Sequence, residues 1–319
     1  MVESSLVAPR TLLTDSTYGT ATLEMLHRTR VEDAFLQQWR RTGDTFVVAG
    51  RWPAHHAFFA PVADGRVDPL LVAETLRQSV HLVVHAGFGL PVGHASILQN
   101  MRFTCLADRL AVAGEATDVD VLVSIPGYEN KGRRTAMMRA ELEILCGGVT
   151  VAHAEFDFQT ISPAVYRRLR AGRTEPVRVR PMTEGIPAAA AGRARAEDVL
   201  LSATPQELSW HLRVDTEHGT LFQSAKDHVP GMLLLEAARQ AAHAACAPDT
   251  FVPWVLDASF HSYVEFGEAC WIQAHELTDT ALGERVVRVT GHQDNRLAFQ
   301  ATLRDPRVSA DRVDARGRR

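Results

Sequence analysis

The sequence predicts an α+β protein made of two copies of one unit, each an antiparallel β-sheet wrapped around one long helix. Two observations lead to this fold class. Segments of the chain recur in the same order at nearly constant spacing, and each copy has one long apolar helix among stretches of strand-like alternation. A helix that is apolar on nearly every face has to be buried, and a curved sheet around it provides that burial.

The repeat is clearest in two helical stretches. "DPLLVAETLRQSVHL" runs from Asp68 to Leu82, and "DHVPGMLLLEAARQAAH" runs from Asp227 to His243. Their polar residues match at an offset of 162 residues, and the pairs are Glu74 and Glu236, Arg77 and Arg239, Gln78 and Gln240, and His81 and His243. Three further segments match in the same order: HRTRVEDAFL with GRARAEDVLL, Arg51 and His56 with Arg213 and His218, and ASILQNMRF with ASFHSYVEF. Such an ordered series indicates a tandem duplication.

Each copy has the same order of expected elements. A β-prone stretch comes first (FVVAGRW or LSWHLRV), the helix follows, and several strands come after it. Cys146-Gly147-Gly148 and Asp294-Asn295 predict hairpin turns. Asp68-Pro69 predicts a helix start, because an Asp caps a helix and a Pro suits its first turn. Pro230-Gly231 predicts the second start, with Asp227 or His228 as the capping side chain.

The same features set the expected domain boundaries. We expect an N-terminal tail over 1–18, a first unit over 19–170, a linker over 171–191, a second unit over 192–305 and a C-terminal tail over 306–319. The linker is rich in Pro, Ala and Arg and lacks periodicity, and the last segment is densely charged.

Composition excludes several classes of function. The chain has 319 residues and a net charge of −4, which argues against a dedicated nucleic-acid surface. It has no apolar run long enough for a membrane span and no secretion signal at its start, so we expect a cytoplasmic protein. The four cysteines lack C-x-x-C spacing, and the histidines lack H-E-x-x-H or facial-triad spacing, so we expect no metal. The glycines at 87–93 do not form a dinucleotide loop, so we expect no cofactor.

The two helices, of the form [PG]-x-L-L-x-x-E-x-x-R-Q, resemble the A-factor biosynthesis (AfsA) family of γ-butyrolactone synthases. "DHVPGMLLLEAARQAA" and "DPLLVAETLRQ" carry the resemblance, "RWPAHHAFF" supports it, and it covers about His27 to Leu303. It implies a tandem hotdog fold. In the family Asp-His-Pro usually precedes the second helix, whereas this chain has Gln223-Ser224-Ala225 there and keeps the Asp-His that follows.

A wider resemblance is to hotdog hydroxyacyl dehydratases, which place a catalytic His 14 residues before the helix Glu. This chain has Phe222 and Ala60 at the two corresponding positions. Neither side chain can move a proton, so dehydration is disfavoured. The AfsA resemblance instead implies transfer of a β-ketoacyl group from acyl carrier protein to the hydroxyl of dihydroxyacetone phosphate. The ester can then close to a butenolide, a precursor of signals that switch on antibiotic production.

The second helix offers one group for each requirement of such a transfer. Glu236 is the expected general base, with a pKa raised by burial. The backbone N–H groups of Gly231 and Met232, at the helix start, are expected to hold the developing oxyanion. Arg239 is a candidate phosphate ligand, because a guanidinium binds phosphate with two prongs. His228 can orient the hydroxyl or move a proton.

Further residues complete the candidate site. Glu74 and Arg77 are the catalytic equivalents in the first unit, and Gln78, Gln240 and Asp227 are expected to bind substrate. The alternative is that each Glu and Arg only neutralise each other as an i,i+3 pair, with the Gln completing the hydrogen bonds.

Two other questions stay open from the sequence. Six arginines between positions 167 and 180 either dock the acidic carrier protein or form a solvated linker. For function, the alternatives to the acyltransferase are a hotdog acyl thioesterase and a non-catalytic acyl- or lactone-binding regulator.

Overall fold

The computed structural model describes residues 17–62, 64–112, 114–130, 135–181, 183–224, 226–277 and 284–306. The chain divides after Glu175 into two compact units, and each is described by itself. Residues 1–16 and 307–319, which make up most of the two expected tails, lie outside the described residues.

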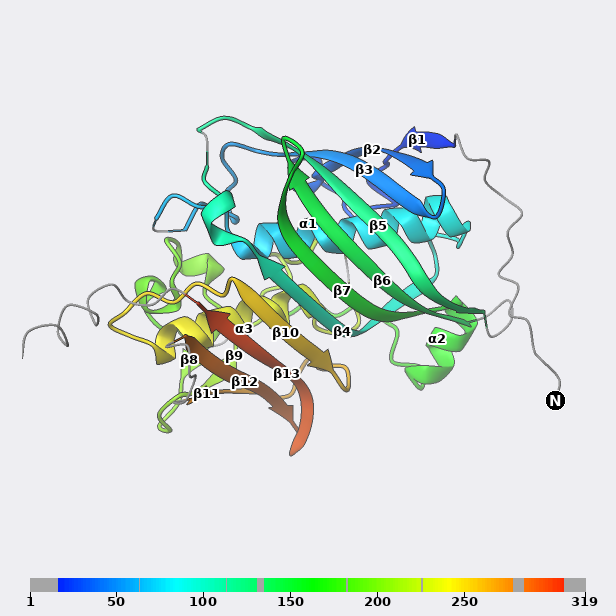
Figure 1. Cartoon of the computed structure of the whole chain (residues 1–319). Helices are drawn as coiled ribbons and strands as arrows, with labels where there is room; N and C mark the ends of the chain where they lie inside the picture. The colour runs from blue at the N-terminus through cyan, green and yellow to red at the C-terminus, as the bar shows by residue number, and fades with distance from the viewer. Residues whose placement is uncertain are drawn as a thin grey trace, which may run out of the picture. The chain divides into compact units, whose positions relative to one another are not determined.

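The first unit is an antiparallel sheet around one helix (Figure 1). Its strands lie in the order β1-β2-β3-β5-β6-β7-β4. Their bounds are β1 Tyr18–Thr20, β2 Leu36–Thr42, β3 Thr45–Trp52, β4 Ala95–Cys105, β5 Thr117–Asn130, β6 Thr135–Cys146 and β7 Val149–Ile161. Helix α1 spans Pro69–Leu82 and continues as a π-helical turn over Val83–Gly87, and a short helix α2 spans Pro163–Leu169.

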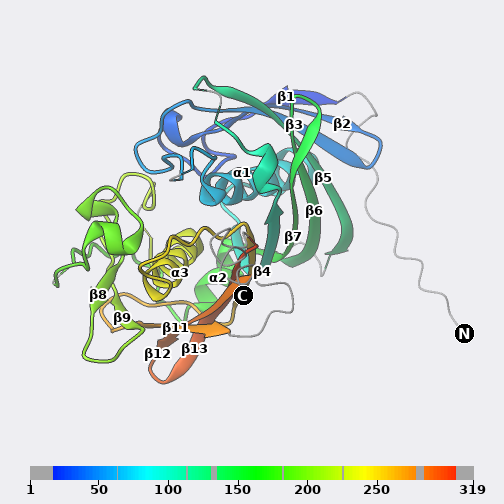
Figure 2. The ribbon, with the colours of Figure 1, turned by 60° about the vertical axis from the view of Figure 1, so that its left-hand side comes forward.

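Helix α1 lies along the concave face of this sheet and packs against β2, β4, β5 and β6 (Figures 1 and 2). Every residue of α1 except Arg77 is buried. The helix is therefore the core of the unit, as its apolar composition predicts. Its polar residues have to find partners inside that core.

The second unit repeats this arrangement with a smaller sheet. Its strands lie in the order β10-β13-β12-β11-β9-β8, all antiparallel. Their bounds are β8 Leu201–Ala203, β9 Ser209–Leu212, β10 Val255–Phe260, β11 Trp271–Leu277, β12 Arg285–Gln293 and β13 Arg296–Asp305. Helix α3, Gly231–Ala245, packs against β8, β11, β12 and β13. The α+β class, with a sheet around one long helix in each copy, is confirmed.

Both predicted hairpin turns are present. Gly147 and Gly148 join β6 to β7 with φ of 56° and 80°, and Asp294 and Asn295 join β12 to β13 with φ of 51° and 57°. Two consecutive residues with positive φ make the turn type whose twist matches that of the two strands, and glycine, Asn and Asp tolerate it best.

Helix starts differ between the units. Asp68 caps α1 as expected, since its side chain accepts a hydrogen bond from the N–H of Leu70 at 2.8 Å. At α3 the expectation of a capping side chain is wrong, because the cap residue is Pro230 and no side chain caps the helix. Asp227 and His228 bond to each other instead.

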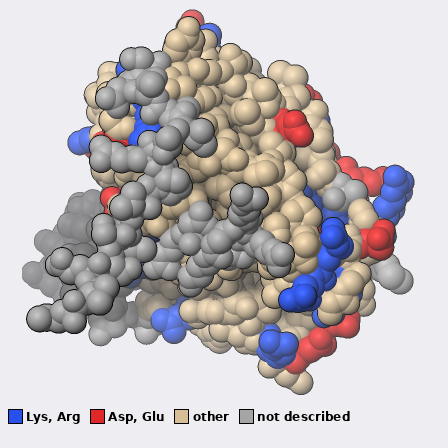
Figure 3. All heavy atoms as spheres, turned by 90° about the vertical axis from the view of Figure 1, so that its right-hand side faces the viewer, with Lys and Arg blue, Asp and Glu red and all other residues tan. Residues whose placement is uncertain are grey.

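On the face that Figure 3 shows, basic and acidic side chains are interspersed over a largely uncharged surface. Among the described residues, no helix has both the length and the apolar character that a membrane crossing requires.

Candidate active site

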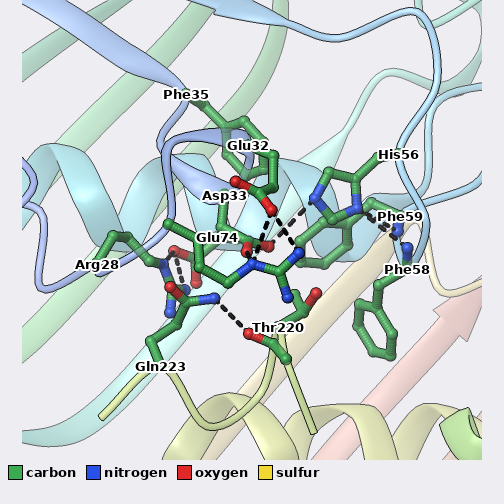
Figure 4. A network of polar contacts seen from close by, with 12 residues as sticks. Arg28, Glu32, Asp33, Phe35, His56, Phe58, Phe59, Glu74, Thr220 and Gln223 are labelled. Carbon is green, nitrogen blue, oxygen red and sulfur yellow. Dashed lines mark hydrogen bonds and ion pairs between the residues drawn. The ribbon is translucent and has the colours of Figure 1, made fainter.

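In each unit the helix carboxylate is held by two arginines and one glutamine. In the first unit, Arg77 donates from Nε and Nη2 to Glu74 at 2.9 and 2.8 Å, and Gln78 donates to Glu74 at 2.6 Å. The second guanidinium belongs to Arg28, whose Nε donates to Glu74 at 2.9 Å (Figure 4). We call Arg28, Glu74, Arg77 and Gln78 the first ion cluster.

The second ion cluster consists of Arg193, Glu236, Arg239 and Gln240. Arg239 donates to both oxygens of Glu236 at 2.8 Å, Arg193 approaches both at 2.7 and 2.6 Å, and Gln240 donates to Oε1 at 2.5 Å. The match extends to the backbone. Each glutamine amide donates to a carbonyl of the preceding segment, Asp33 or Asp198, and each accepts an N–H from that segment.

These contacts set the charge of the two glutamates. Burial by itself would raise the pKa of a carboxyl group, but the two nearby guanidinium groups outweigh it and lower the pKa of Glu236 to about 2. The pKa of Glu74 falls to about 2 for the same reason. The upward shift expected from the sequence is therefore wrong in direction. A carboxylate whose lone pairs are all engaged, with so low a pKa, is a weak base.

The geometry favours the alternative in which Glu, Arg and Gln satisfy one another. Each cluster ties its helix to the segment before it, because Arg28 and Arg193 lie 46 and 43 residues upstream of the helix Glu. Sequence reasoning missed these two arginines. They occupy matching positions in HRTRVEDAFL and GRARAEDVLL, so the repeat itself contained the signal.

A second duplicated contact fixes the loop before each helix. Nδ1 of His56 accepts the N–H groups of Phe58 and Phe59 at 3.1 Å, so the ring proton lies on Nε2, which donates to Asp33 at 3.2 Å (Figure 4). His218 bonds to Asp198 in the same way at 3.1 Å. These histidines anchor loops.

The two helix starts offer different numbers of open backbone donors. At α1, Pro69 has no N–H, Leu70 is capped, and Leu71 bonds to the carbonyl of Asp68. At α3, the N–H groups of Gly231 and Met232 donate no hydrogen bond among the described residues. Both residues are half-buried. In the part of the chain that the structure describes, the second unit therefore differs from the first in having a pair of unpaired N–H groups at the positive end of its long helix.

Next to this helix start is an acid–imidazole pair. Nδ1 of His228 lies 2.7 Å from Oδ1 of Asp227, and the His228 ring packs edge-on against Tyr263 with centroids 4.5 Å apart. The side chain of His228 is 23% exposed and that of Asp227 is 9% exposed. A carboxylate on Nδ1 fixes the ring so that Nε2 can take a proton from a bound group. We call Asp227, His228, Gly231 and Met232 the helix-start site.

Comparison with known proteins finds a matching protein family and several proteins of similar sequence. Residues 12–162 and 174–307 match the A-factor biosynthesis hotdog domain. A protein of Streptomyces coelicolor named 2-oxo-3-(phosphooxy)propyl 3-oxoalkanoate synthase is 46% identical over 90% of this chain and 92% of its own length. A protein of Streptomyces griseus with the same name is 44% identical over 90% of this chain and 95% of its own length.

Among solved structures, an oleoyl thioesterase from Lactobacillus plantarum is similar in fold. It has a TM-score of 0.50, 12% identity, and a match covering 82% of this chain and 96% of its own. At that identity the likeness concerns the hotdog fold alone. The extent of the family match and the identity to the Streptomyces synthases show that this chain belongs to the A-factor biosynthesis hotdog family.

Proposed function

We propose that this protein transfers a 3-oxoacyl group from a thioester to the primary hydroxyl of dihydroxyacetone phosphate, forming a 2-oxo-3-(phosphooxy)propyl 3-oxoalkanoate. One observation carries the proposal. Four relatives, 40–46% identical over about nine-tenths of this chain, share the name of a synthase of that ester. The product is a precursor of a γ-butyrolactone signal.

We assign the chemistry to the helix-start site. The thioester carbonyl would lie against the N–H groups of Gly231 and Met232, which stabilise negative charge on its oxygen as the hydroxyl attacks. Two aligned donors and the helix dipole act together here, and losing one such donor typically costs a factor of about 100 to 1,000 in kcat. Gly231 has no side chain, so a substrate atom can approach its backbone closely.

His228 is the base in this proposal. The acceptor's hydroxyl oxygen forms a bond to the acyl carbon while its proton passes to Nε2 of His228. The carbon–sulfur bond then breaks, and the departing thiolate takes that proton back. Asp227 supports the imidazolium that exists in between. The exposed part of His228 gives the acceptor access, which the fully buried Glu236 lacks.

In this scheme the ion clusters hold each long helix against the segment before it. Arg239 and its equivalent Arg77 stay candidate ligands of the substrate phosphate, as the sequence predicted. Arg77 is the more open of the two candidates, with a side chain 18% exposed against 8% for Arg239. The substrate-binding roles of Gln78 and Gln240 are less favoured, because both amides bond to the backbone and to the helix Glu.

The proposal also keeps three finer expectations from the sequence. Acyl carrier protein delivers the 3-oxoacyl thioester, the protein acts in the cytoplasm, and the two hotdog units occupy 19–170 and 192–305 with a linker between them. Exposed arginines on α2, Arg167 and Arg168, are candidates for the acidic carrier.

The test is an assay of the purified protein with a 3-oxoacyl thioester, with and without dihydroxyacetone phosphate. We expect loss of thioester and appearance of the phosphorylated ester only when the acceptor is present. Equal loss without the acceptor would identify a thioesterase instead. No loss in either case, together with tight binding of the acyl group or lactone, would identify a non-catalytic binding protein.

A further inference from the structure

Three histidines that neither ion cluster contains lie together in the first unit. One ring nitrogen from each of His27, His81 and His85 lies within 4.8 Å of the other two. Nε2 of His27 is 2.9 Å from Nε2 of His85, and the ring of His27 stacks on that of His81 with centroids 4.1 Å apart. We call these residues the histidine cluster.

His27 lies in the histidine cluster with its backbone in a strained conformation. Its φ is 53°, in the left-handed region, where a residue with a Cβ costs roughly 1 kcal/mol or more. The duplicated segment has Gly192 at the matching position, with φ of 63°, where glycine adopts this conformation without that cost. The same turn therefore exists in both units, and only the first holds a side chain there that can bind a ligand.

The other two histidines come from one helix and are four residues apart. That spacing places His81 and His85 on the same face, and the π-helical turn over Val83–Gly87 contains His85. π-turns inside helices are frequent at functional sites. Both residues are buried, with 9% and 7% exposure, and Nδ1 of His81 has no hydrogen-bond partner among the described residues. A buried ring nitrogen without a partner is costly unless a ligand uses it.

The hydrogen bonds of His85 present a lone pair to the cluster. Its Nδ1 lies 2.8 Å from the carbonyl oxygen of Leu90, so Nδ1 carries the proton and Nε2 is unprotonated. This is how proteins orient a metal-binding histidine: one nitrogen donates to a carbonyl and the other faces the ion. Burial also lowers the pKa of His81, which keeps its ring neutral.

From this geometry we propose that the histidine cluster binds a divalent transition-metal ion that prefers nitrogen ligands, with Zn²⁺ as the representative ion. Nitrogens bound to tetrahedral Zn²⁺ at about 2.0–2.1 Å lie about 3.3 Å apart. The His27–His85 separation of 2.9 Å is about 0.4 Å shorter than this, so these two rings need only a small movement apart. The third nitrogen, within 4.8 Å, has to move by about 1.5 Å or less. Three imidazoles leave a fourth position for water or an anion.

Nearby charges favour an anion at that fourth position. Arg77 lies one helical turn before His81 on α1, and Arg28 directly follows His27 in the chain, so both guanidinium groups lie near the cluster. The carboxylate of Glu74, which both arginines contact, offsets one of these positive charges. Hydroxide or a phosphate oxygen would offset the remaining positive charge.

The second unit serves as an internal comparison, because the residues matching the cluster are Gly192, His243 and Ala247. A single histidine remains there, and its Nδ1 lies 3.3 Å from the carbonyl of Phe251.

The cysteines are poor competitors for the ion. Burial raises the pKa of Cys146 and Cys246 to about 11 and that of Cys270 to about 12, so these thiols stay protonated.

The test uses the full chain freed of metal with a chelator, titrated with Zn²⁺ by calorimetry and with Co²⁺ by visible absorption. His27→Gly is the decisive variant, because glycine fits the backbone at this position and its fold should be at least as stable as the original. His85→Asn removes a second ligand. His153→Asn, an exposed histidine on β7, is the matched control.

We expect one Zn²⁺ per chain, bound at least about tenfold more weakly by His27→Gly and by His85→Asn and unchanged by His153→Asn. Zn²⁺ should raise the Tm of the original protein and not that of His27→Gly. Equal affinity of His27→Gly and the original, less than one ion per chain, or a Co²⁺ spectrum dominated by thiolate charge transfer would each overturn the proposal. None of these measurements needs a substrate, so their outcome is independent of the acyltransferase assay.

Discussion

Replacing Glu236 by glutamine tests the interpretation of the ion clusters most directly. The substitution keeps the shape of the side chain and removes its charge, so the buried guanidinium groups of Arg193 and Arg239 lose the carboxylate that both contact. The pKa of Glu236 falls from 4.5 to about 2, and each pKa unit corresponds to about 1.4 kcal/mol, so the folded state favours the ionised carboxylate by about 3 kcal/mol. Breaking a buried ion pair from one side typically costs about 3–5 kcal/mol.

Urea denaturation at pH 7 measures this loss. With a slope of about 2 kcal/mol per molar urea for a unit of this size, we expect the unfolding midpoint of the second unit to fall by about 1.5 M. Glu141→Gln is the control, because Glu141 is exposed on β6 and its change should stay within about 0.5 kcal/mol.

The contribution of Glu236 to the free energy of unfolding should depend on pH in a known direction. The folded pKa of Glu236 is lowered, so its contribution is complete above pH 4.5 and is lost as the pH falls toward 2. The difference between the original protein and Glu236→Gln should therefore be constant from pH 6 to 8 and shrink below pH 4.5. Equal stability of the two proteins at pH 7 would refute the interpretation of Glu236 as part of a stabilising buried ion cluster. Glu236 would then again be a candidate for the general base.

Four other outcomes follow from the structure. Gly231→Ala should keep the Tm, because an added Cβ meets its nearest atom, on Phe260, at 3.6 Å, yet it should lower kcat by about 100-fold in the thioester assay by obstructing the oxyanion donors. His228→Ala should lower kcat by about 100- to 10,000-fold with an unchanged Tm, and a smaller loss would remove it as the base. Asp68→Ala should reduce the unfolding free energy by about 1 kcal/mol in denaturant titrations and leave kcat unchanged, since the start of α1 has no open donors. Reversing the charge of Arg167 and Arg168 should raise KM for the carrier-protein thioester but not for a pantetheine thioester, and equal effects on both would exclude carrier docking.

Features that depend on local chain geometry could be predicted from the sequence. The repeat, the long apolar helices, the cap at Asp68 and the turn at Asp294-Asn295 all follow from rules that act over a few residues. The motif of the two helices was enough to predict the family and the hotdog fold. The sequence also predicted that the N–H groups of Gly231 and Met232 lie at a helix start, where they lack intrahelical partners, but it predicted a capping side chain that the structure does not have.

Only the tertiary structure decided the state of the buried charges. The helix motif shows one arginine beside Glu236, and from burial alone its pKa was expected to rise. The fold brings Arg193 from 43 residues upstream to the same carboxylate, and the guanidinium groups of Arg193 and Arg239 together outweigh the effect of burial. In the same way His27 joins His81 and His85 across more than 50 residues. Electrostatic energy depends on the distance between charges in space, and the periodicity of one helix holds no information about charges that other segments supply.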